Sequence, residues 1–118
     1  MKLPAAERAF VDPAKGRDYL LNPHHLVGAS KARFFAALGF TRRRWAVLYQ
    51  ALRAHATDGD AEAGQPSLYG QKYMVRATIV GPTGREAYLV SVWIVLKDED
   101  FPRLATAFPG VPDDESHP

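Results

Sequence analysis

The sequence predicts an α+β fold in which three N-terminal helices pack on one face of a C-terminal antiparallel sheet of three to four strands. Apolar residues recur at helical spacing in the first half of the chain and alternate at strand spacing in the second half. The helical segments all precede the strands, and a tight turn joins the two longest strands. This order favours a separate helical layer over an alternating parallel sheet.

The first two helices are predicted from their end signals. Asp12 can cap a helix whose first residue is Pro13, and this helix should run to about residue 21 with Tyr19 facing inward. Ser30 is the expected cap of a second helix, and Gly39 is expected to end it. Both segments are short, so their stability should come from packing rather than from helix propensity.

The third helix has the clearest periodicity. Thr41 is its expected cap, and it should reach about His55, which then lies at a helix end. Its apolar residues fall at i, i+3, i+4 and i+7: Trp45, Leu48, Tyr49 and Leu52. The following stretch, 57–68, contains Asp, Gly and Pro without periodicity, and it is expected to be a loop.

Strands are expected after residue 70. Residues 71–80 alternate, and a turn at 81–84 leads to residues 86–96, which are apolar on both faces. A strand apolar on both faces should be central and covered on both sides, with Trp93 buried under the helices. Residues 103–108 form a shorter last strand.

Composition indicates one domain spanning residues 1–108, followed by a mobile acidic tail at 109–118. The net charge of +2 is unevenly distributed. Residues 1–56 carry ten Lys or Arg and three Asp or Glu, a balance of +7, whereas residues 57–118 carry five and ten, a balance of −5. Such asymmetry is typical of a polyanion-binding surface or of ordinary solvated helix faces, and both readings stay open.

Several function classes are excluded or disfavoured. The chain has no cysteine, which excludes disulfides and thiolate metal sites and fits a cytoplasmic location. No apolar run reaches the roughly 20 residues that a membrane helix needs. No spacing of His, Asp or Glu matches a metal site, and no nucleotide-binding loop is present, so neither a metal nor another cofactor is expected.

The segment from Asn22 to Phe35 carries the main candidate site. His25 lies on a loop bounded by Pro and Gly, and an imidazole can act as acid or base near neutral pH. Lys31 is expected in the first turn of a helix, where its charge opposes the helix dipole. A bound phosphate would satisfy both the lysine and the helix end; otherwise, Lys31 extends into solvent and His25 bonds backbone.

Other candidates lie outside this segment. Arg103 can donate two hydrogen bonds to a phosphate and Thr106 one more, although an arginine there would also suit an ion pair with a nearby aspartate. The remaining candidates are expected to bind substrate by charge, hydrogen bonding or stacking: Asn22, Arg42, Arg43, Lys72 and Tyr73. Arginine runs are common on solvated faces, and a strand tyrosine is more often a core residue.

The chain resembles a family of uncharacterised bacterial domains of unknown function through four motifs. The family reads Asn-Pro-x-His-Pro-x-Gly-x-x-Lys-Ala, Tyr-Gly-x-Lys/Arg-Tyr, Trp-Ile-Val and Pro-Arg-Leu-x-Thr-x-Tyr, in that order. The matching residues here are Asn22, Pro23, His25, Gly28, Lys31, Ala32, Tyr69, Gly70, Lys72, Tyr73, Trp93, Ile94, Val95, Pro102, Arg103, Leu104 and Thr106. Leu26 replaces the second proline of the first motif, and Phe108 replaces the final tyrosine.

The resemblance implies a small domain that occurs alone or within phage-linked polymorphic toxins. Its helices-then-sheet order is similar to the barnase, EndoU and RelE group of RNase toxins, an analogy of fold rather than of site. Four residues that these motifs contain are the catalytic candidates: His25 would be the acid or base, Lys31 and Arg103 would hold the scissile phosphate, and Thr106 would assist. The changes at Leu26 and Phe108 bear on activity if the loop geometry or the missing hydroxyl matters.

Two hypotheses follow. In the first, the chain is a toxin-like, metal-independent RNA-cleaving domain of a toxin–antitoxin or phage-linked system, with RNA as substrate and an acidic antitoxin or immunity protein as partner. In the second, it is a non-catalytic binding module, such as an antitoxin, immunity or accessory protein. Convergence of the candidate residues favours the first, because catalytic groups must reach one substrate together.

Overall fold

The computed structural model describes residues 1–22, 24 and 29–110. It contains helices followed by a four-stranded antiparallel sheet, as the sequence predicts. The helical elements are a 3₁₀ turn η1 (Ala6–Arg8), α1 (Pro13–Lys15) continued by a π-helical segment η2 (Gly16–Leu20), α2 (Ala29–Ala37) and α3 (Trp45–Asp58). The strands are β1 (Asp60–Pro66), β2 (Gly70–Val80), β3 (Glu86–Leu96) and β4 (Pro102–Pro109).

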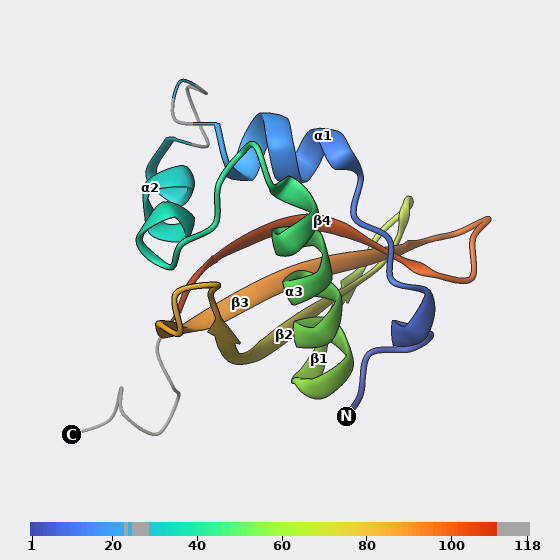
Figure 1. The fold of residues 1–118 in the computed structure, drawn as a ribbon. Helices are drawn as coiled ribbons and strands as arrows, with labels where there is room; N and C mark the ends of the chain where they lie inside the picture. The colour runs from blue at the N-terminus through green and yellow to red at the C-terminus, as the bar shows by residue number, and fades with distance from the viewer. Residues whose placement is uncertain (23, 25–28, 111–118) are drawn as a thin grey trace.

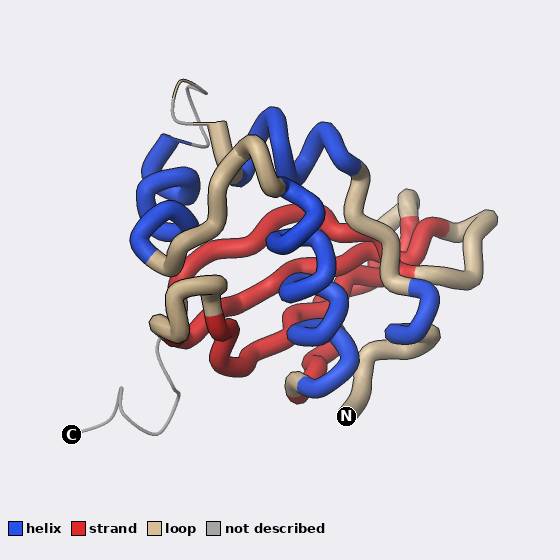
Figure 2. The backbone as a smooth tube through the Cα atoms, viewed as in Figure 1, coloured by secondary structure: helices blue, strands red, loops and turns tan. Residues whose placement is uncertain are grey.

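The sheet is a simple meander, and the helices lie against one of its faces. The strand order is β1-β2-β3-β4, and every neighbouring pair is antiparallel. Figure 1 shows α3 crossing the sheet, where it contacts β2 and β3, and α2 lying toward β4. In Figure 2 the blue helical layer and the red sheet are separate, which is the two-layer arrangement of an α+β domain.

The core forms between α3 and the inner face of β2 and β3. Leu48 and Leu52 of α3 are fully buried, and they belong to one cluster with Val75 and Leu89 of the sheet and with Trp93, which is 0% exposed. Burial of each such side chain contributes about 1.5–3 kcal/mol. The predicted stripe of α3 and the predicted burial of Trp93 are therefore confirmed.

The residues predicted to begin and end the first two helices are only partly confirmed. The Asp12 carboxylate accepts a hydrogen bond from the Ala14 amide at 2.9 Å, as expected of a cap. Gly39 ends the second helix with a φ of 97°, a conformation that favours glycine. Ser30, the expected cap, is the second residue of this helix, whose described part begins at Ala29.

The expected third helix is shifted toward the C-terminus. The Thr41 hydroxyl accepts a hydrogen bond from the Arg44 amide at 3.2 Å, but this contact closes a turn, and α3 begins only at Trp45. The helix continues beyond His55 to Asp58, where Gly59 follows in extended conformation. His55 therefore lies in the last turn of α3, as expected, and its backbone carbonyl accepts from the Gly59 amide at 3.0 Å.

The expected loop at 57–68 is wrong for most of its length, because residues 60–66 form β1. This strand pairs with β2 in the register Asp60 to Arg76 and Ala63 to Tyr73. Most of β1 is exposed, so its side chains carry no apolar alternation for a sequence pattern to detect. Backbone pairing with β2 stabilises it instead.

The prediction that β3 is covered on both sides holds only in part among the described residues, because Val90 on the face opposite Trp93 is buried. The helices cover only the face that carries Trp93. On the opposite face, Val92 and Ile94 are half-buried and line an open groove together with Met74 and Lys72 of β2. The apolar character of that face is therefore not explained by a second helical layer.

The N-terminal segment reaches both edges of the sheet. The Met1 carbonyl accepts a hydrogen bond from the Ala61 amide at 2.7 Å, at the β1 edge. Phe10 forms a parallel bridge with Arg103, and the Leu104 amide donates to the Phe10 carbonyl at 3.0 Å, at the β4 edge. These bonds occupy edge groups that would otherwise be free to pair with another chain.

β4 contains a bulge that affects the candidate site. Val92 pairs with Thr106, but its neighbour Trp93 pairs with Leu104, so one extra residue, Ala105, lies in β4. Leu104 and Ala107 are both buried, with two residues between them instead of one. A bulge of this kind redirects side chains from the strict alternation of a strand.

Within the described part of the chain, none of the helices combines the length and apolar character needed to span a bilayer.

Candidate functional site

Three polar side chains from distant parts of the chain meet where η2, α2 and β4 come together. The Lys31 ammonium group donates to the Tyr19 hydroxyl at 2.7 Å and to the Thr106 hydroxyl at 2.7 Å. Tyr19 lies in η2, Lys31 in α2 and Thr106 in β4. Residues 31 and 106 were both predicted as site residues, and the fold brings them into direct contact.

Thr106 lies next to the bulge in β4. It pairs with Val92, and both Leu104 and Ala107 are buried. The Thr106 hydroxyl nevertheless accepts a hydrogen bond from Lys31 of the helical layer, so this contact does not follow from the strand register.

Positive charge dominates the surroundings of the Tyr19 ring. The Lys31 nitrogen is 5.0 Å from the ring centroid, and the Lys15 nitrogen is 5.1 Å from it. The Lys31 hydrogen bond lowers the pKa of the Tyr19 hydroxyl, and a hydrogen bond from Thr106 lowers it further, while burial opposes both effects. The phenolate form is therefore favoured more than in an ordinary tyrosine.

The cluster of Tyr19, Lys31 and Thr106 remains accessible to a ligand. All three residues are half-buried rather than enclosed. An ammonium group has three donors, and the hydrogen bonds to Tyr19 and Thr106 use two of them. The cluster can therefore add an anionic or hydroxyl ligand without breaking its own contacts.

Arg103 lies elsewhere and has a partner. Its guanidinium donates two hydrogen bonds of 2.7 Å to the Glu99 carboxylate, and it stacks near the rings of Phe10 at 5.1 Å and Phe101 at 5.0 Å. This pairing raises the pKa of Arg103 and lowers the pKa of Glu99. The expected type of contact, an ion pair, is present, but with Glu99 rather than with an aspartate.

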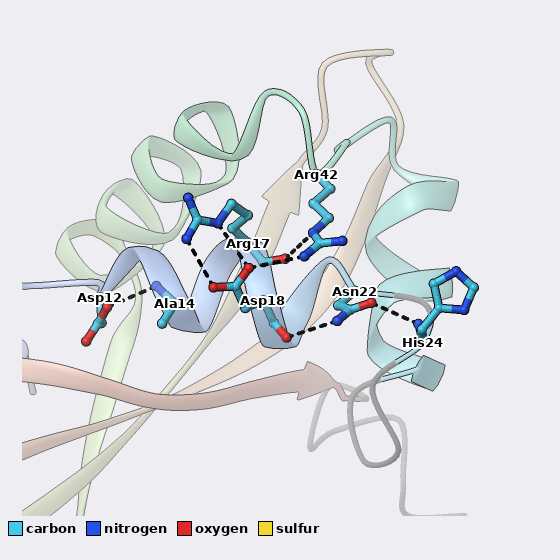
Figure 3. Close-up of polar contacts among 7 residues, drawn as sticks. All are labelled: Asp12, Ala14, Arg17, Asp18, Asn22, His24 and Arg42. Atoms are coloured by element: carbon cyan, nitrogen blue, oxygen red, sulfur yellow. Dashed lines mark hydrogen bonds and ion pairs between the residues drawn. The ribbon is translucent and has the colours of Figure 1, made fainter.

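Asn22 is occupied by local backbone contacts. Its side-chain oxygen accepts from the His24 amide at 2.9 Å, and its side-chain nitrogen donates to the Asp18 carbonyl at 3.4 Å, as Figure 3 shows. These contacts give Asn22 a role in ending the first helical segment. His24 is exposed, in agreement with its expected surface position.

Arg42 ties the loop before α3 to η2 (Figure 3). Its guanidinium contacts the Asp18 carboxylate at 3.2 Å and the Arg17 carbonyl at 3.1 Å. Arg17 binds the same carboxylate, and the two arginines lower the pKa of Asp18, with Arg17 as the larger cause. Arg43, by contrast, is exposed, and no ion pair involves it in the described ranges.

Lys72 and Tyr73 point to opposite faces of β2. Tyr73 pairs with Trp93 and packs at the edge of the core, which is the ordinary role of a strand tyrosine. Lys72 is exposed and lines the groove on the face without helices. Lys31 lies in the helical layer, so the fold does not bring Lys72 to the cluster.

His25 lies outside the described residues, and so does Leu26. The site described here therefore does not include the His25 imidazole or its position relative to Lys31. Phe108, at the position where a tyrosine is usual, pairs with Val90 near the end of β4 and is half-buried.

A second polar cluster was missed by sequence reasoning. His55 is 4% exposed, and its Nδ1 lies 2.9 Å from the Ser91 hydroxyl, which also accepts from the Trp93 indole at 2.8 Å. Burial lowers the pKa of His55. A signal was available: His55 falls three residues after Leu52, within the same apolar stripe.

In the residues that the structure describes, no three His, Asp or Glu side chains gather closely enough to hold a metal ion. The Tyr19–Lys31–Thr106 cluster offers hydrogen-bond donors and a titratable hydroxyl rather than a carboxylate set. Its chemistry suits anion binding and proton transfer.

Comparison with known proteins identifies a family and a fold. No curated protein matches the chain. A chain in a structure described as a contact-dependent growth inhibition toxin–immunity protein complex from Klebsiella pneumoniae 342 superposes with a TM-score of 0.69 and 24% identity. The match covers 92% of this chain and 98% of that chain, and at this identity it shows a shared fold. A family model described as a domain of unknown function (DUF6883) matches residues 2–111, and the chain therefore belongs to that family.

Proposed function

We propose that this chain is a toxin-like domain that cleaves RNA without a metal ion. The observation that carries this proposal is the contact of Lys31 with both Tyr19 and Thr106, at 2.7 Å each. A metal-independent ribonuclease needs a cation against the scissile phosphate and a group that transfers protons. This cluster offers both in one half-buried place.

Lys31 is the proposed phosphate ligand. Among the described residues its third ammonium donor has no partner and can bind a phosphate oxygen, while Tyr19 and Thr106 hold the side chain in place. Thr106 assists by fixing that ammonium group. Arg103 is given a structural role in this proposal, because the paired Glu99 carboxylate balances its charge.

The N-terminal half is the proposed RNA-facing surface. Its balance of +7 attracts a polyanion, and Arg43 is an exposed cation on it. His25 keeps its sequence-based role as a further acid or base. An acidic partner protein would block the same surface, and an RNA substrate would place the activity in the cytoplasm.

The structural neighbour supports a toxin–immunity context for this chain. That complex contains a toxin and an immunity protein, and this chain shares the fold of one of its chains. The second candidate function is therefore an immunity or accessory module that binds a partner without catalysis. Under that alternative, Lys31 would only join α2 to β4.

The decisive experiment is RNA digestion in the presence of a metal chelator. Wild type is compared with Lys31→Gln and with Lys97→Gln, a matched control because Lys97 is an exposed lysine of the β3–β4 connection. We expect wild type and K97Q to degrade RNA and K31Q to lose at least about 100-fold in rate. No cleavage by folded wild type, or equal cleavage by K31Q, would remove the support for this function.

Growth assays separate the two candidates. Expression of a ribonuclease toxin should arrest growth, and K31Q or His25→Ala should relieve the arrest. An immunity or accessory protein should be harmless in both forms. Harmless wild type at verified expression levels would favour the binding module.

A further inference from the structure

We propose that Tyr19 and Lys31 are the proton-transfer pair of the cleavage reaction, with Tyr19 as the base and Lys31 as the acid. This inference rests on the proposed function. Its basis is geometric: one phenolic oxygen and one ammonium nitrogen lie 2.7 Å apart in a half-buried site, and a threonine from the far end of the chain bonds to both.

The surroundings suit a phenolate. The Tyr19 oxygen accepts hydrogen bonds from Lys31 and from Thr106. The charged groups of the described residues that face the ring are Lys31 from α2 and Lys15 from α1, at 5.0 and 5.1 Å from its centroid. Both are cations, so the nearby charge favours the deprotonated hydroxyl.

The reaction balances without another reactant. The Tyr19 phenolate takes the proton of a ribose 2′-hydroxyl, whose oxygen attacks the adjacent phosphorus. The bond from phosphorus to the 5′-oxygen breaks, and the Lys31 ammonium gives that oxygen a proton. The products are a 2′,3′-cyclic phosphate and a 5′-hydroxyl end, and the enzyme is left as a neutral phenol beside a neutral amine.

The hydrogen bond between Tyr19 and Lys31 provides the path that restores the starting protonation state of both residues. After cleavage the proton moves from the Tyr19 hydroxyl to the Lys31 amine across 2.7 Å. Ordinary tyrosine and lysine have similar pKa values, about 10 and 10.4, so this transfer needs little driving force. Thr106 positions both partners because its hydroxyl accepts from Lys31 and donates to Tyr19.

The π-helical segment provides the required position for the hydroxyl. Tyr19 is the fourth residue of Gly16–Leu20, which winds more widely than an α-helix. Such segments are rare and frequently occur at functional sites. Here the segment presents the phenol to α2 and β4, and the Asp18 contacts with Arg17 and Arg42 hold it from the other side.

The test uses two substrates and matched variants. Tyr19→Phe removes only the hydroxyl, and Tyr69→Phe is its control at an exposed position. The first substrate is ordinary RNA, and the second carries sulfur in place of the bridging 5′-oxygen, a leaving group that needs no proton. We expect Y19F to lose at least about 100-fold in kcat on both substrates, with unchanged KM and unfolding temperature.

The sulfur substrate identifies the acid. Lys31→Gln should be slow on ordinary RNA and partly restored on the sulfur substrate, which replaces the acid but not the hydrogen bond from Lys31 to Tyr19, whereas Y19F should not be restored. Thr106→Val should raise the midpoint of the pH–rate profile, since the Tyr19 oxygen loses a donor. This shift is measurable in a folded enzyme and would not follow from a merely structural role.

Each outcome decides the proposal. Wild-type cleavage with an equally active Y19F would overturn the assignment and leave the nuclease function standing. Failure of the sulfur substrate to restore K31Q, or an unshifted profile in T106V, would also overturn it. No cleavage by folded wild type would refute the proposed function, and this inference with it.

Discussion

His55 of α3 and Ser91 of β3 share a buried hydrogen bond of 2.9 Å between Nδ1 and Oγ. The other ring nitrogen of His55 lies 3.1 Å from the carbonyl oxygens of both Ala77 and Leu89. Carbonyls can only accept, so Nε2 carries the proton and Nδ1 accepts from the Ser91 hydroxyl. The neutral imidazole therefore joins α3 to two strands with every polar atom satisfied.

This arrangement predicts a loss of stability in mild acid. Burial lowers the pKa of His55, while the unfolded chain titrates near the ordinary value of about 6.5. Below that pH the unfolded state binds a proton that the folded state does not, so the free energy of unfolding decreases as pH falls toward the folded pKa. The slope from this one group has an upper limit of about 1.4 kcal/mol per pH unit.

Urea unfolding at several pH values between about 5.5 and 7.5 measures this slope. His55→Gln should unfold with a flatter pH dependence in the same range, because the titrating group is gone. The contribution of His55 is complete above the unfolded pKa and is lost below it. An identical pH dependence in wild type and H55Q would contradict the prediction.

Ser91→Ala removes a single oxygen atom, yet it should clearly lower the free energy of unfolding. It leaves the Trp93 indole without an acceptor and His55 Nδ1 without a donor, both in the core. Each unsatisfied buried group costs about 1–3 kcal/mol, so we expect a loss of about 2–4 kcal/mol in urea unfolding. Thr78→Ala, on the exposed side of β2, is the control and should change stability by less than about 1 kcal/mol.

Gly81→Ala should destabilise the contact between α2 and the β2–β3 hairpin. A Cβ at Gly81 would overlap the carbonyl oxygen of Leu38, which is backbone and cannot rotate away. We expect a loss of about 3 kcal/mol or more. Gly64→Ala is the matched control, because its nearest neighbour, the Lys72 carbonyl oxygen, is 3.6 Å away. Equal thermal unfolding of the two variants would show that the hairpin packs differently.

Variants at Arg103 and Glu99 test whether Arg103 has a structural role or binds phosphate. If the arginine only organises the start of β4, Arg103→Ala should lower the unfolding temperature through the lost ion pair and ring contacts, with cleavage within about threefold of wild type. Glu99→Gln frees the guanidinium. A clear rise in RNA cleavage by E99Q would instead identify Arg103 as a phosphate ligand.

The helical layer and the long hairpin were predictable because they depend on local patterns. The Leu48–Leu52 stripe and the alternation through Val75 and Ile79 each reflect burial on one face. Burial on one face appears in the sequence as a regular spacing of apolar residues. β1 was not predictable in this way. Its residues are mostly exposed, and it forms a strand because β2 offers unpaired backbone groups.

The candidate site was predictable only as a set of residue types. Lys31 and Thr106 were suspected from motifs 75 positions apart, but neither their contact nor the extra residue Ala105 in β4 follows from the sequence. No periodicity in the sequence reveals a bulge. Tyr19 was expected to face inward, and the sequence contained no indication that two lysines would flank its ring.

The pairing of the N-terminal segment has a consequence for biosynthesis. Phe10 leaves the ribosome more than ninety residues before its backbone partners, Pro102 and Leu104. Closing so long a loop is slow compared with local helix formation. The pairing of Phe10 therefore waits until residue 104 has been translated, and a nascent chain halted before that residue exposes the backbone groups of this sheet edge.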